Sequence, residues 1–340
     1  MAGKILETIY KTFPKSTKAD WEKQAGKDLK GKDLVELNWQ INTKFQLEAY
    51  YTEEEIENLD HGILQNYNPD WQIAQDYWVE NYQESNSEIL ADLMHGLDAP
   101  ILHFAKEPSL GELKKLFEGI DLAYISTHFA NPSLELYSLW NQVLKEKNIA
   151  EAPVYFYFSK EQDLCSVKSI YIDLRKDYSG EESLITELKS ALKQAKDHLE
   201  NSQNKSYCAK QLFFCFYVDS AYFLSIAKLR AFKLLFVDML KEYNLNLDLP
   251  FIRVELAPEK HFEITEDELV PATSMAMSAV LGGAEHLLVR PGDESSRAKR
   301  LARNVQLILK NESGLHKTAD PCQGSYYVES LTKLLVEACK

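Results

Sequence analysis

Residues 154–158 read VYFYF and residues 211–218 read QLFFCFYV, two short runs that are apolar or aromatic almost throughout. A strand with one face in water alternates apolar and polar residues, whereas a strand buried on both faces can be apolar at every position. Strands of the second kind are typical of parallel sheets with both faces covered. These two runs therefore favour an α/β fold.

Six further runs of this kind occur along the chain, and amphipathic segments separate them. The alternation predicts a parallel sheet with helical crossovers, and eight strands favour closure into a (β/α)8 TIM-type barrel. No G-x-G-x-x-G motif follows the first run, which weakens the dinucleotide-binding alternative. The predicted strands are 71–79, 101–105, 122–126, 154–158, 167–173, 211–218, 251–256 and 286–290. The predicted helices are 86–96, 109–118, 132–147, 180–200, 219–243, 266–282, 295–311 and a last one that begins at Tyr326.

Residues 1–70 follow a different pattern and predict an N-terminal arm or linker that packs on the barrel or on a partner subunit, with the barrel at 71–340. A helical stretch at 17–29 carries Trp21, Ala25 and Leu29 on one face. Two strand-like pieces, 35–41 and 45–51, follow it. The sequence stops inside a predicted helix, at LLVEACK, which suggests that the barrel is cut short at its C-terminus.

Composition excludes several classes of function. The 340 residues carry a net charge of −14, which argues against a nucleic-acid partner. The five cysteines are odd in number and show no C-x-x-C spacing, so we expect a reducing compartment. The N-terminal MAGKILETIYKTF has no apolar signal core, and no apolar run is long enough to span a membrane. We expect a cytoplasmic protein, although removal of an organelle signal stays open.

Polar residues near the ends of the predicted strands are the first candidates for chemistry, because functional groups of a barrel lie at the C-terminal ends of its strands. Asp76 has the chemistry of a general base, but a solvated or capping carboxylate is the commoner case. His128 has the chemistry of an acid or base, although hydrogen-bonded packing is commoner. The fifth predicted strand ends at Asp173, and we expect Asp173 and Arg175 to pair with each other in a solvated loop.

Other motifs offer less. The eight histidines never fall at H-x-x-x-H or H-E-x-x-H spacing, and no G-x-S-x-G or Walker-type loop is present. Arg297, Arg300 and Arg303 recur along one side of a predicted helix. Such a stripe serves an anionic ligand or a protein interface, or it is a solvated face with i,i+4 partners. We favour the solvated face.

Bulky side chains on two strands bear on the barrel interior. Residues 154–158 and 213–217 are rich in Phe and Tyr, and alternation directs at least one or two rings of each strand inward. The interior of an eight-stranded barrel is only just wide enough for side chains. We therefore expect rings to fill the axis, whereas a barrel that threads a substrate along its axis needs small residues there.

Three stretches, IAKLRAFKLLF (226–236), ARNVQLILKNESG (302–314) and DPCQGSYYVESLT (320–332), resemble the barrel domain of the methylmalonyl-CoA mutase family. ADWEKQAGKDLKGKDLVELNW (19–39) and AYYTEE (49–54) are similar to the linker and arm of that family's small subunit. The resemblance covers nearly the whole chain and is weakest over 86–200. It implies a homodimer of catalytic chains, or a heterodimer of one catalytic and one non-catalytic subunit. The catalytic chain uses adenosylcobalamin to interconvert methylmalonyl-CoA and succinyl-CoA by a radical rearrangement.

The chain departs from the catalytic members of this family at the motifs that matter most. Their first strand carries R-Q-Y-A-G, and the similar segment here, 71–86, places Ala74 at the Arg and Asp76 at the Tyr. Their T-V-Q-N-D run corresponds to VYFYFSKE (154–161), and their G-Y-H-M run to IDLRKDY (172–178). Their cobalt-ligating D-x-H-x-x-G motif is missing. The resemblance thus assigns no catalytic, cofactor-binding or metal-binding residue to this chain.

The leading hypothesis is a non-catalytic small subunit of methylmalonyl-CoA mutase that forms a heterodimer with the catalytic large subunit. We then expect adenosylcobalamin on the partner and no cofactor on this chain, although a degenerate cobalamin-type domain beyond residue 340 stays open. The alternative is a diverged acyl-CoA mutase barrel that is itself active with a cobalamin-binding domain on another chain. A third reading is a stand-alone binding or scaffold barrel, which no motif supports.

Overall fold

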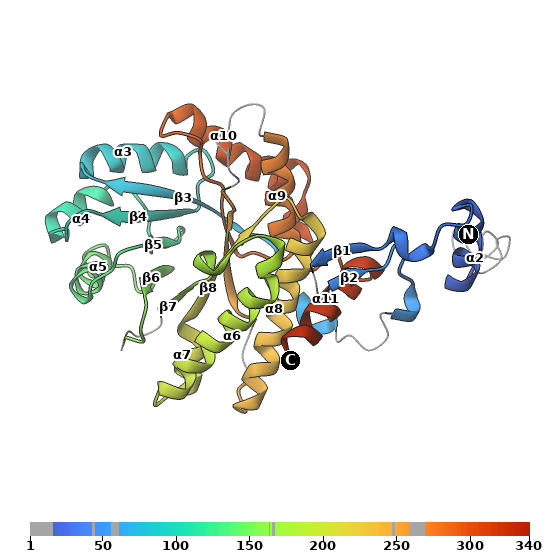
Figure 1. Ribbon diagram of the computed structural model, residues 1–340. Coiled ribbons are helices and arrows are strands. Elements are labelled where there is room, and N and C mark those ends of the chain that lie inside the picture. Colours follow the sequence, from blue (N-terminus) through green and yellow to red (C-terminus); the bar gives the residue numbers. More distant parts are fainter. Residues whose placement is uncertain are drawn as a thin grey trace, which may run out of the picture.

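Eight parallel strands close into a barrel in the computed structural model, which confirms the predicted (β/α)8 fold (Figure 1). The structure describes residues 16–42, 45–55, 61–162, 164, 167–246, 249–258 and 269–340. Each strand pairs in parallel with the next, and pairing of the last strand with the first closes the barrel. The barrel strands are β3 (Gln72–Val79), β4 (Ala99–Phe104), β5 (Thr127–Phe129), β6 (Val154–Phe158), β7 (Lys168–Asp173), β8 (Leu212–Val218), β9 (Phe251–Leu256) and β10 (His286–Leu288).

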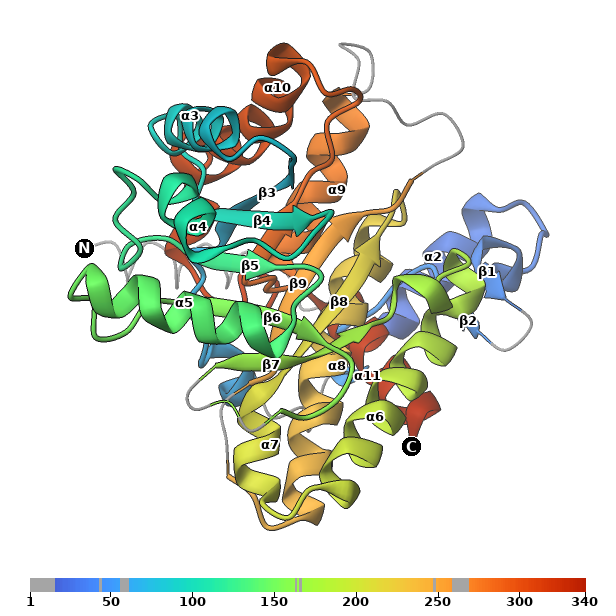
Figure 2. The ribbon, with the colours of Figure 1, turned by 90° about the vertical axis from the view of Figure 1, so that its left-hand side faces the viewer.

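Helices surround this barrel, as Figure 2 shows. The short helix α7 was not predicted, and residues 266–268 of the predicted 266–282 helix lie outside the described residues. The connection from β6 to β7 contains no helix in its described residues, 159–162, 164 and 167. The helices are α3 (Tyr82–Leu93), α4 (Leu110–Leu116), α5 (Leu134–Glu146), α6 (Leu184–Asn201), α7 (Lys205–Gln211), α8 (Tyr222–Glu242), α9 (Leu269–Leu281), α10 (Ser296–Leu307) and α11 (Tyr326–Cys339).

The prediction of the third strand is wrong by five residues. Residues 122–126 form a turn, and the strand follows at Thr127–Phe129. Asp121 fixes that turn, because its side chain accepts from the backbone of Ala123 at 3.1 Å and its carbonyl accepts from that of Tyr124 at 3.3 Å. Leu122 and Ile125 are nevertheless buried under the helices, so the apolar run reflects core packing rather than strand pairing.

The N-terminal segment lies to one side of the barrel (Figure 1). Helix α2 (Lys18–Asp28) begins with a capping box between Thr17 and Asp20 and buries no residue. A hairpin of β1 (Trp39–Asn42) and β2 (Phe45–Leu47) follows. Leu34–Leu37 is a 3-10 turn, so the predicted strand at 35–41 is wrong in its first half. Residues 1–13, which carry the amphipathic N-terminal stretch, lie outside the described residues.

Two contacts hold the end of this segment against helix α11. The rings of Tyr51 and Tyr327 meet edge to face at 5.8 Å, and Lys333 Nζ lies 3.4 Å from the carbonyl oxygen of Glu55. Leu47 is buried in the main apolar cluster. The hairpin is therefore anchored on the barrel, while α2 stands away from it.

Alternation along the strands separates two kinds of core. Outward residues such as Phe156 of β6 and Phe214 of β8 are fully buried among apolar side chains beneath the helices. Inward residues of the same strands, such as Tyr155 and Phe213, lie inside the barrel and contact each other at 5.8 Å between ring centroids. The inward set decides what the barrel can bind.

Candidate functional site at the barrel mouth

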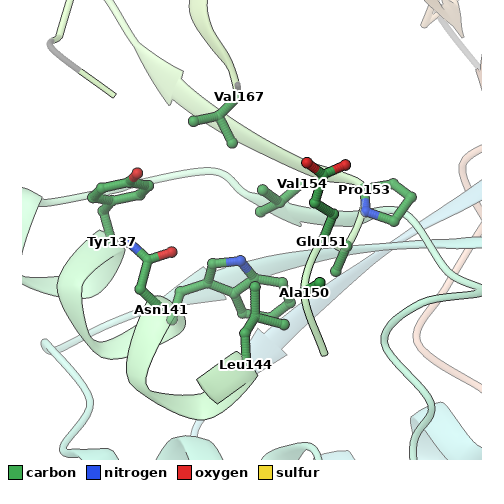
Figure 3. Close-up of a pocket in the computed structure, with 10 residues that line it drawn as sticks. Tyr137, Asn141, Leu144, Ala150, Glu151, Pro153, Val154 and Val167 are labelled. Atoms are coloured by element: carbon green, nitrogen blue, oxygen red, sulfur yellow. The ribbon is translucent and has the colours of Figure 1, made fainter. Parts of the chain in front are cut away.

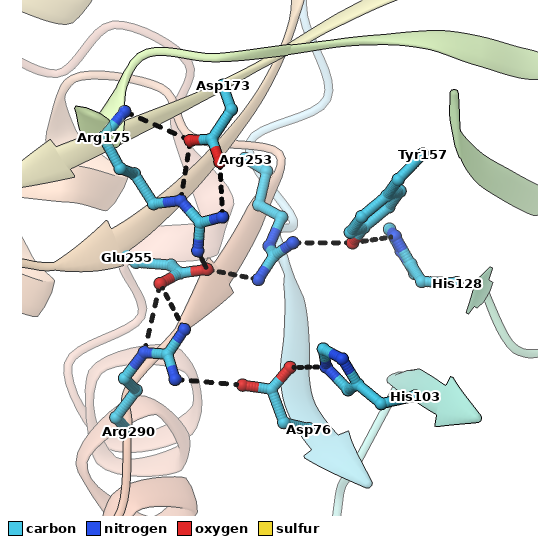
Figure 4. A network of polar contacts seen from close by, with 9 residues as sticks. All are labelled: Asp76, His103, His128, Tyr157, Asp173, Arg175, Arg253, Glu255 and Arg290. Carbon is cyan, nitrogen blue, oxygen red and sulfur yellow. Dashed lines mark hydrogen bonds and ion pairs between the residues drawn. The ribbon is translucent and has the colours of Figure 1, made fainter. Parts of the chain in front are cut away.

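A connected group of polar side chains occupies the C-terminal end of the barrel (Figure 4). Its members come from six strands and from the turns after β7 and β10, and hydrogen bonds or ion pairs join them. This is the end at which barrel proteins place their functional residues. We call this group the mouth network; it consists of Asp76, His103, His128, Tyr157, Asp173, Arg175, Arg253, Glu255 and Arg290.

Three arginines converge on the fully buried carboxylate of Glu255. Arg175 Nη1 donates to Oε1 at 2.6 Å, and Arg253 Nη2 donates to the same oxygen. Arg290 donates to Oε2 from Nη2 at 2.9 Å and from Nε at 3.2 Å. Both carboxylate oxygens are therefore occupied by guanidinium donors.

Two aspartates complete the charge balance of the mouth network. Asp173 accepts from Arg175 Nε at 2.8 Å and from Nη2 at 2.7 Å, a bidentate pair. Asp76 lies 3.5 Å from Arg290 Nη1 and accepts from His103 Nε2 at 2.8 Å. Leaving the histidines aside, three arginines face three carboxylates, so the network is neutral as a unit.

The arginines keep these buried carboxylates ionised. Burial raises the pKa of Glu255, but the charges of Arg253, Arg175 and Arg290 outweigh it, and the pKa lies below its ordinary value. Burial also raises the pKa of Asp76, and its bond to His103 together with the nearby arginines lowers it further than burial raises it. A carboxylate with a lowered pKa is a poor general base near neutral pH.

A hydroxyl relay links the network to the barrel interior. Arg253 Nη1 donates to the Tyr157 hydroxyl oxygen at 2.7 Å, and that hydroxyl lies 2.9 Å from His128 Nδ1. Because the guanidinium of Arg253 cannot accept a hydrogen bond, the Tyr157 hydroxyl donates its own to His128. The acceptor, Nδ1, is therefore the unprotonated ring nitrogen. His128 Nε2 carries the proton and has no hydrogen-bond partner among the described residues.

Both histidines of the interior are neutral. Burial, aided by His286 and Arg253, holds the pKa of His128 well below its ordinary value. Burial and Arg253 lower the pKa of His286 to about 3. Their rings meet edge to face at 4.7 Å. Neither histidine is placed to exchange protons with solvent near neutral pH.

Aromatic rings fill the barrel axis beneath the network, as expected from the sequence. Tyr155 of β6 lies 4.8 Å from Phe251 of β9 and 5.0 Å from His286 of β10, between ring centroids. Strand β6 is a neighbour of neither β9 nor β10 in the barrel, so these two contacts cross its interior. Tyr171 continues the packing against Tyr157 at 4.4 Å and Phe213 at 5.0 Å. Aromatic side chains from opposite strands therefore meet in the barrel interior.

The sequence-based candidates are brought together here, and Asp76 departs most from its expected environment. Asp76 is not solvated, since it is buried and paired with His103 and Arg290. Asp173 and Arg175 pair with each other as predicted, and Arg175 pairs in addition with buried Glu255. His128 is hydrogen-bonded packing.

Arg253, Glu255 and Arg290 were not predicted as members of a site. Arg253 and Glu255 lie two residues apart in the apolar strand FIRVEL, so both point inward with their charges. Two opposite charges two residues apart in an otherwise apolar strand were the sequence signal that could have indicated these members of the site.

The arginine stripe on α10 divides into two parts. Arg297 and Arg300 are exposed, as predicted. Arg303 is buried, which makes the solvated-face prediction wrong at this position. It donates to Gln75 Oε1 at 2.5 Å and pairs with Asp92 at 2.7 Å, so it joins α10 to β3 and α3.

A groove of about 520 Å³ lies on the outer side of the barrel, between α5 and the starts of β6 and β7. Figure 3 shows Tyr137 and Asn141 on one side of it and Val167 on another. None of its described lining residues belongs to the mouth network. It is separate from the candidate site.

The described residues offer neither a metal centre nor a membrane-spanning helix. They contain no group of three or more His, Cys, Asp or Glu arranged to hold a metal ion. In the same part of the chain, no helix has the length and apolar character that crossing a membrane requires.

Comparison with known proteins shows similarity to one family. The family described as Methylmalonyl-CoA mutase matches residues 179–340. The methylmalonyl-CoA mutase of Rhizobium meliloti is 33% identical over 168 residues, which cover 46% of this chain and 24% of the relative. The methylmalonyl-CoA mutase small subunit of Porphyromonas gingivalis is 25% identical over 98% of this chain and 63% of its own length. The methylmalonyl-CoA mutase of Cereibacter sphaeroides is 24% identical over 93% of this chain and 56% of its own length.

The chain therefore spans less than two thirds of the length of each of these relatives. The similarity to the small subunit extends over almost all of this chain. With the closed parallel barrel, these matches show that the chain is similar to the methylmalonyl-CoA mutase family, by the family model over residues 179–340 and by the small subunit over 98% of its length.

Proposed function

We propose that this chain is the non-catalytic small subunit of an adenosylcobalamin-dependent methylmalonyl-CoA mutase, and that it supports a catalytic large subunit by forming a heterodimer with it. In this complex the large subunit carries the isomerisation of methylmalonyl-CoA to succinyl-CoA. The observation that carries the proposal is the self-paired mouth network above a filled axis. The similarity to a protein named as a small subunit supports it.

The chemistry of the mouth supports a barrel without catalysis. An acyl-CoA substrate brings a carboxylate, phosphates and a long chain, which need free cations and an open path. Here the guanidinium groups of the mouth network are engaged by the chain's own carboxylates. Tyr155 and Phe251 meet across the path. The described residues of the mouth do not fit adenosylcobalamin either, because His103 is engaged by Asp76 and His128 is sealed inside. We place that cofactor on the large subunit.

The N-terminal segment offers a surface for the partner. Val35, Leu37, Trp39 and Tyr50 are each between 42% and 57% exposed. Trp21 of α2 stacks on Tyr50 at 4.8 Å, and α2 buries none of its residues. Exposed apolar groups gathered on one projecting segment are typical of protein interfaces. We propose that residues 16–55 contact the large subunit, in a cytoplasmic complex.

Co-expression with the large subunit tests the proposal. A tag on this chain is expected to recover the large subunit in equal amounts, and the isolated chain is expected to be inactive with adenosylcobalamin added. Failure to co-purify, together with full activity of the large subunit alone, would remove the subunit role. Activity of this chain with a separate cobalamin-binding protein would instead support the diverged-enzyme alternative.

A further inference from the structure

We propose that the barrel mouth is a carboxylate-binding site whose occupant is the chain's own Glu255 side chain, so that removing this side chain opens a site for a small external carboxylate such as acetate. The inference concerns this chain alone and holds whether or not a partner subunit exists.

The donors around Glu255 have the arrangement of an anion site. Arg175, Arg253 and Arg290 reach the carboxylate from β9 itself and from the turns after β7 and β10, so the three guanidinium groups surround it. Planar guanidinium forks are the groups that proteins use to recognise carboxylates. Four N–H groups point at two oxygens, and the chain supplies the anion itself.

Neighbouring contacts hold these donors in place without Glu255. Asp173 grips Arg175 through two hydrogen bonds of 2.7 and 2.8 Å. Arg253 donates to the Tyr157 hydroxyl at 2.7 Å, and Arg290 lies 3.5 Å from Asp76. The guanidinium groups are therefore pre-positioned, and loss of the Glu255 carboxylate leaves one positive charge in excess.

The site is reachable from solvent once it is vacated. Glu255 itself is fully buried, but the side chain of Arg290 above it is 44% exposed, and those of Arg175 and Asp173 are partly exposed. Replacing Glu255 by Ala removes one methylene and one carboxylate, the atoms of acetate. The vacated space thus matches acetate in size as well as in charge.

The test compares Glu255→Ala with the wild type during thermal unfolding in sodium acetate and in sodium chloride at equal ionic strength. The variant is expected to melt below the wild type in chloride and to recover in acetate in a saturable way. At ten times the dissociation constant, bound acetate raises the ratio of folded to unfolded protein about 11-fold. The wild type is expected to melt alike in both salts.

Two variants separate this effect from a general effect of acetate. Glu255→Gln keeps the side-chain volume, so it is expected to be destabilised without recovery in acetate. Glu187→Ala removes another fully buried carboxylate, paired with Lys228 at 3.0 Å, but under the helices and away from the mouth. It is expected to show no acetate recovery either.

The proposal fails if Glu255→Ala gains no more from acetate than from chloride, or if the two control variants recover equally. If Glu255→Ala does not fold in chloride, the yield of folded protein on dilution from urea decides. A higher yield in acetate than in chloride, seen for this variant alone, supports the site, and equal yields overturn it.

Discussion

Arg230 of α8 and Asp320 form a buried bidentate ion pair, in which Arg230 Nε and Nη2 donate to the two carboxylate oxygens at 2.8 and 2.9 Å. The same guanidinium bonds Glu329 of α11 at 3.0 and 3.1 Å. Two of the stretches that resemble the mutase family, 226–236 and 320–332, are thus joined at their charged residues. This pairing joins α8 to α11 in the barrel wall, and none of its three residues belongs to the mouth network.

Arg230→Met is expected to destabilise the protein by about 3–5 kcal/mol, because it leaves two buried carboxylates without their cation. Urea unfolding followed by circular dichroism measures the loss. Lys241→Met is the matched control, since Lys241 pairs with Asp238 at 3.1 Å on the surface and is expected to change stability by less than about 1 kcal/mol. Equal stability of the two variants would contradict the structural role of Arg230.

The sequence predicts the barrel well because its strands carry local signals. The strands 154–158 and 251–256 are apolar enough to be placed at their observed ends. The third strand was misplaced because Leu122 and Ile125 are buried for a different reason, in a turn that packs under helices. Burial alone does not separate these cases.

The mouth network was beyond prediction because its partners are distant in sequence. Arg175 and Glu255 are 80 residues apart, and Glu255 and Arg290 are 35 apart. The sequence shows each charge but not which charge it meets, since barrel closure decides the pairing. Their positions near strand ends made four members candidates: Asp76, His128, Asp173 and Arg175. To predict Arg253 and Glu255 as members, one must also know which face of β9 points into the barrel.

Tyr157→Phe is expected to destabilise the protein by about 1–3 kcal/mol, because Arg253 Nη1 loses its acceptor and His128 Nδ1 its donor inside the barrel. The imidazole nitrogen chemical shifts of His128 give a second readout. The wild type is expected to show a protonated Nε2 and an unprotonated Nδ1. Tyr124→Phe is the control, since Tyr124 is 84% exposed. A wild-type His128 protonated on Nδ1 would refute the direction of the relay.

Stability is expected to fall as the pH drops from 7.5 to 5.5, because His128 and His286 stay neutral when folded and take up protons when unfolded. The pKa of His286 is about 3 in the folded chain against an ordinary value of about 6.5. The unfolded state therefore binds more protons between these values, and stability is lost as the pH falls through that window. Each histidine accounts for about 1.4 kcal/mol over this range.

His286→Phe tests this assignment, because phenylalanine keeps an aromatic ring among Tyr155 and Phe251 but cannot be protonated. Its loss of stability between pH 7.5 and 5.5 is expected to be about 1.4 kcal/mol smaller than that of the wild type. His95→Gln changes an exposed histidine and is expected to leave the wild-type loss unaltered. An unchanged pH dependence in His286→Phe would show that this histidine is not the source.

Trp39→Ala is expected to weaken binding of the proposed large subunit about 30-fold, since a central aromatic residue at an interface commonly contributes about 2 kcal/mol or more. Trp39 is 45% exposed in the described chain and projects from the hairpin outside the barrel, so its removal is expected to leave the unfolding midpoint almost unchanged. Titration of the tagged chain with the large subunit measures the dissociation constant.

Met94→Ser, which changes an 85% exposed residue beside α3, is the matched control and is expected to bind as the wild type does. If Trp39→Ala, Met94→Ser and a chain lacking α2 all bind equally well, the N-terminal segment is not the contact surface, and the flank of the barrel becomes the place to search. If Trp39→Ala binds normally while a chain lacking α2 does not, the contact lies on α2, whose apolar face carries Trp21 against Tyr50.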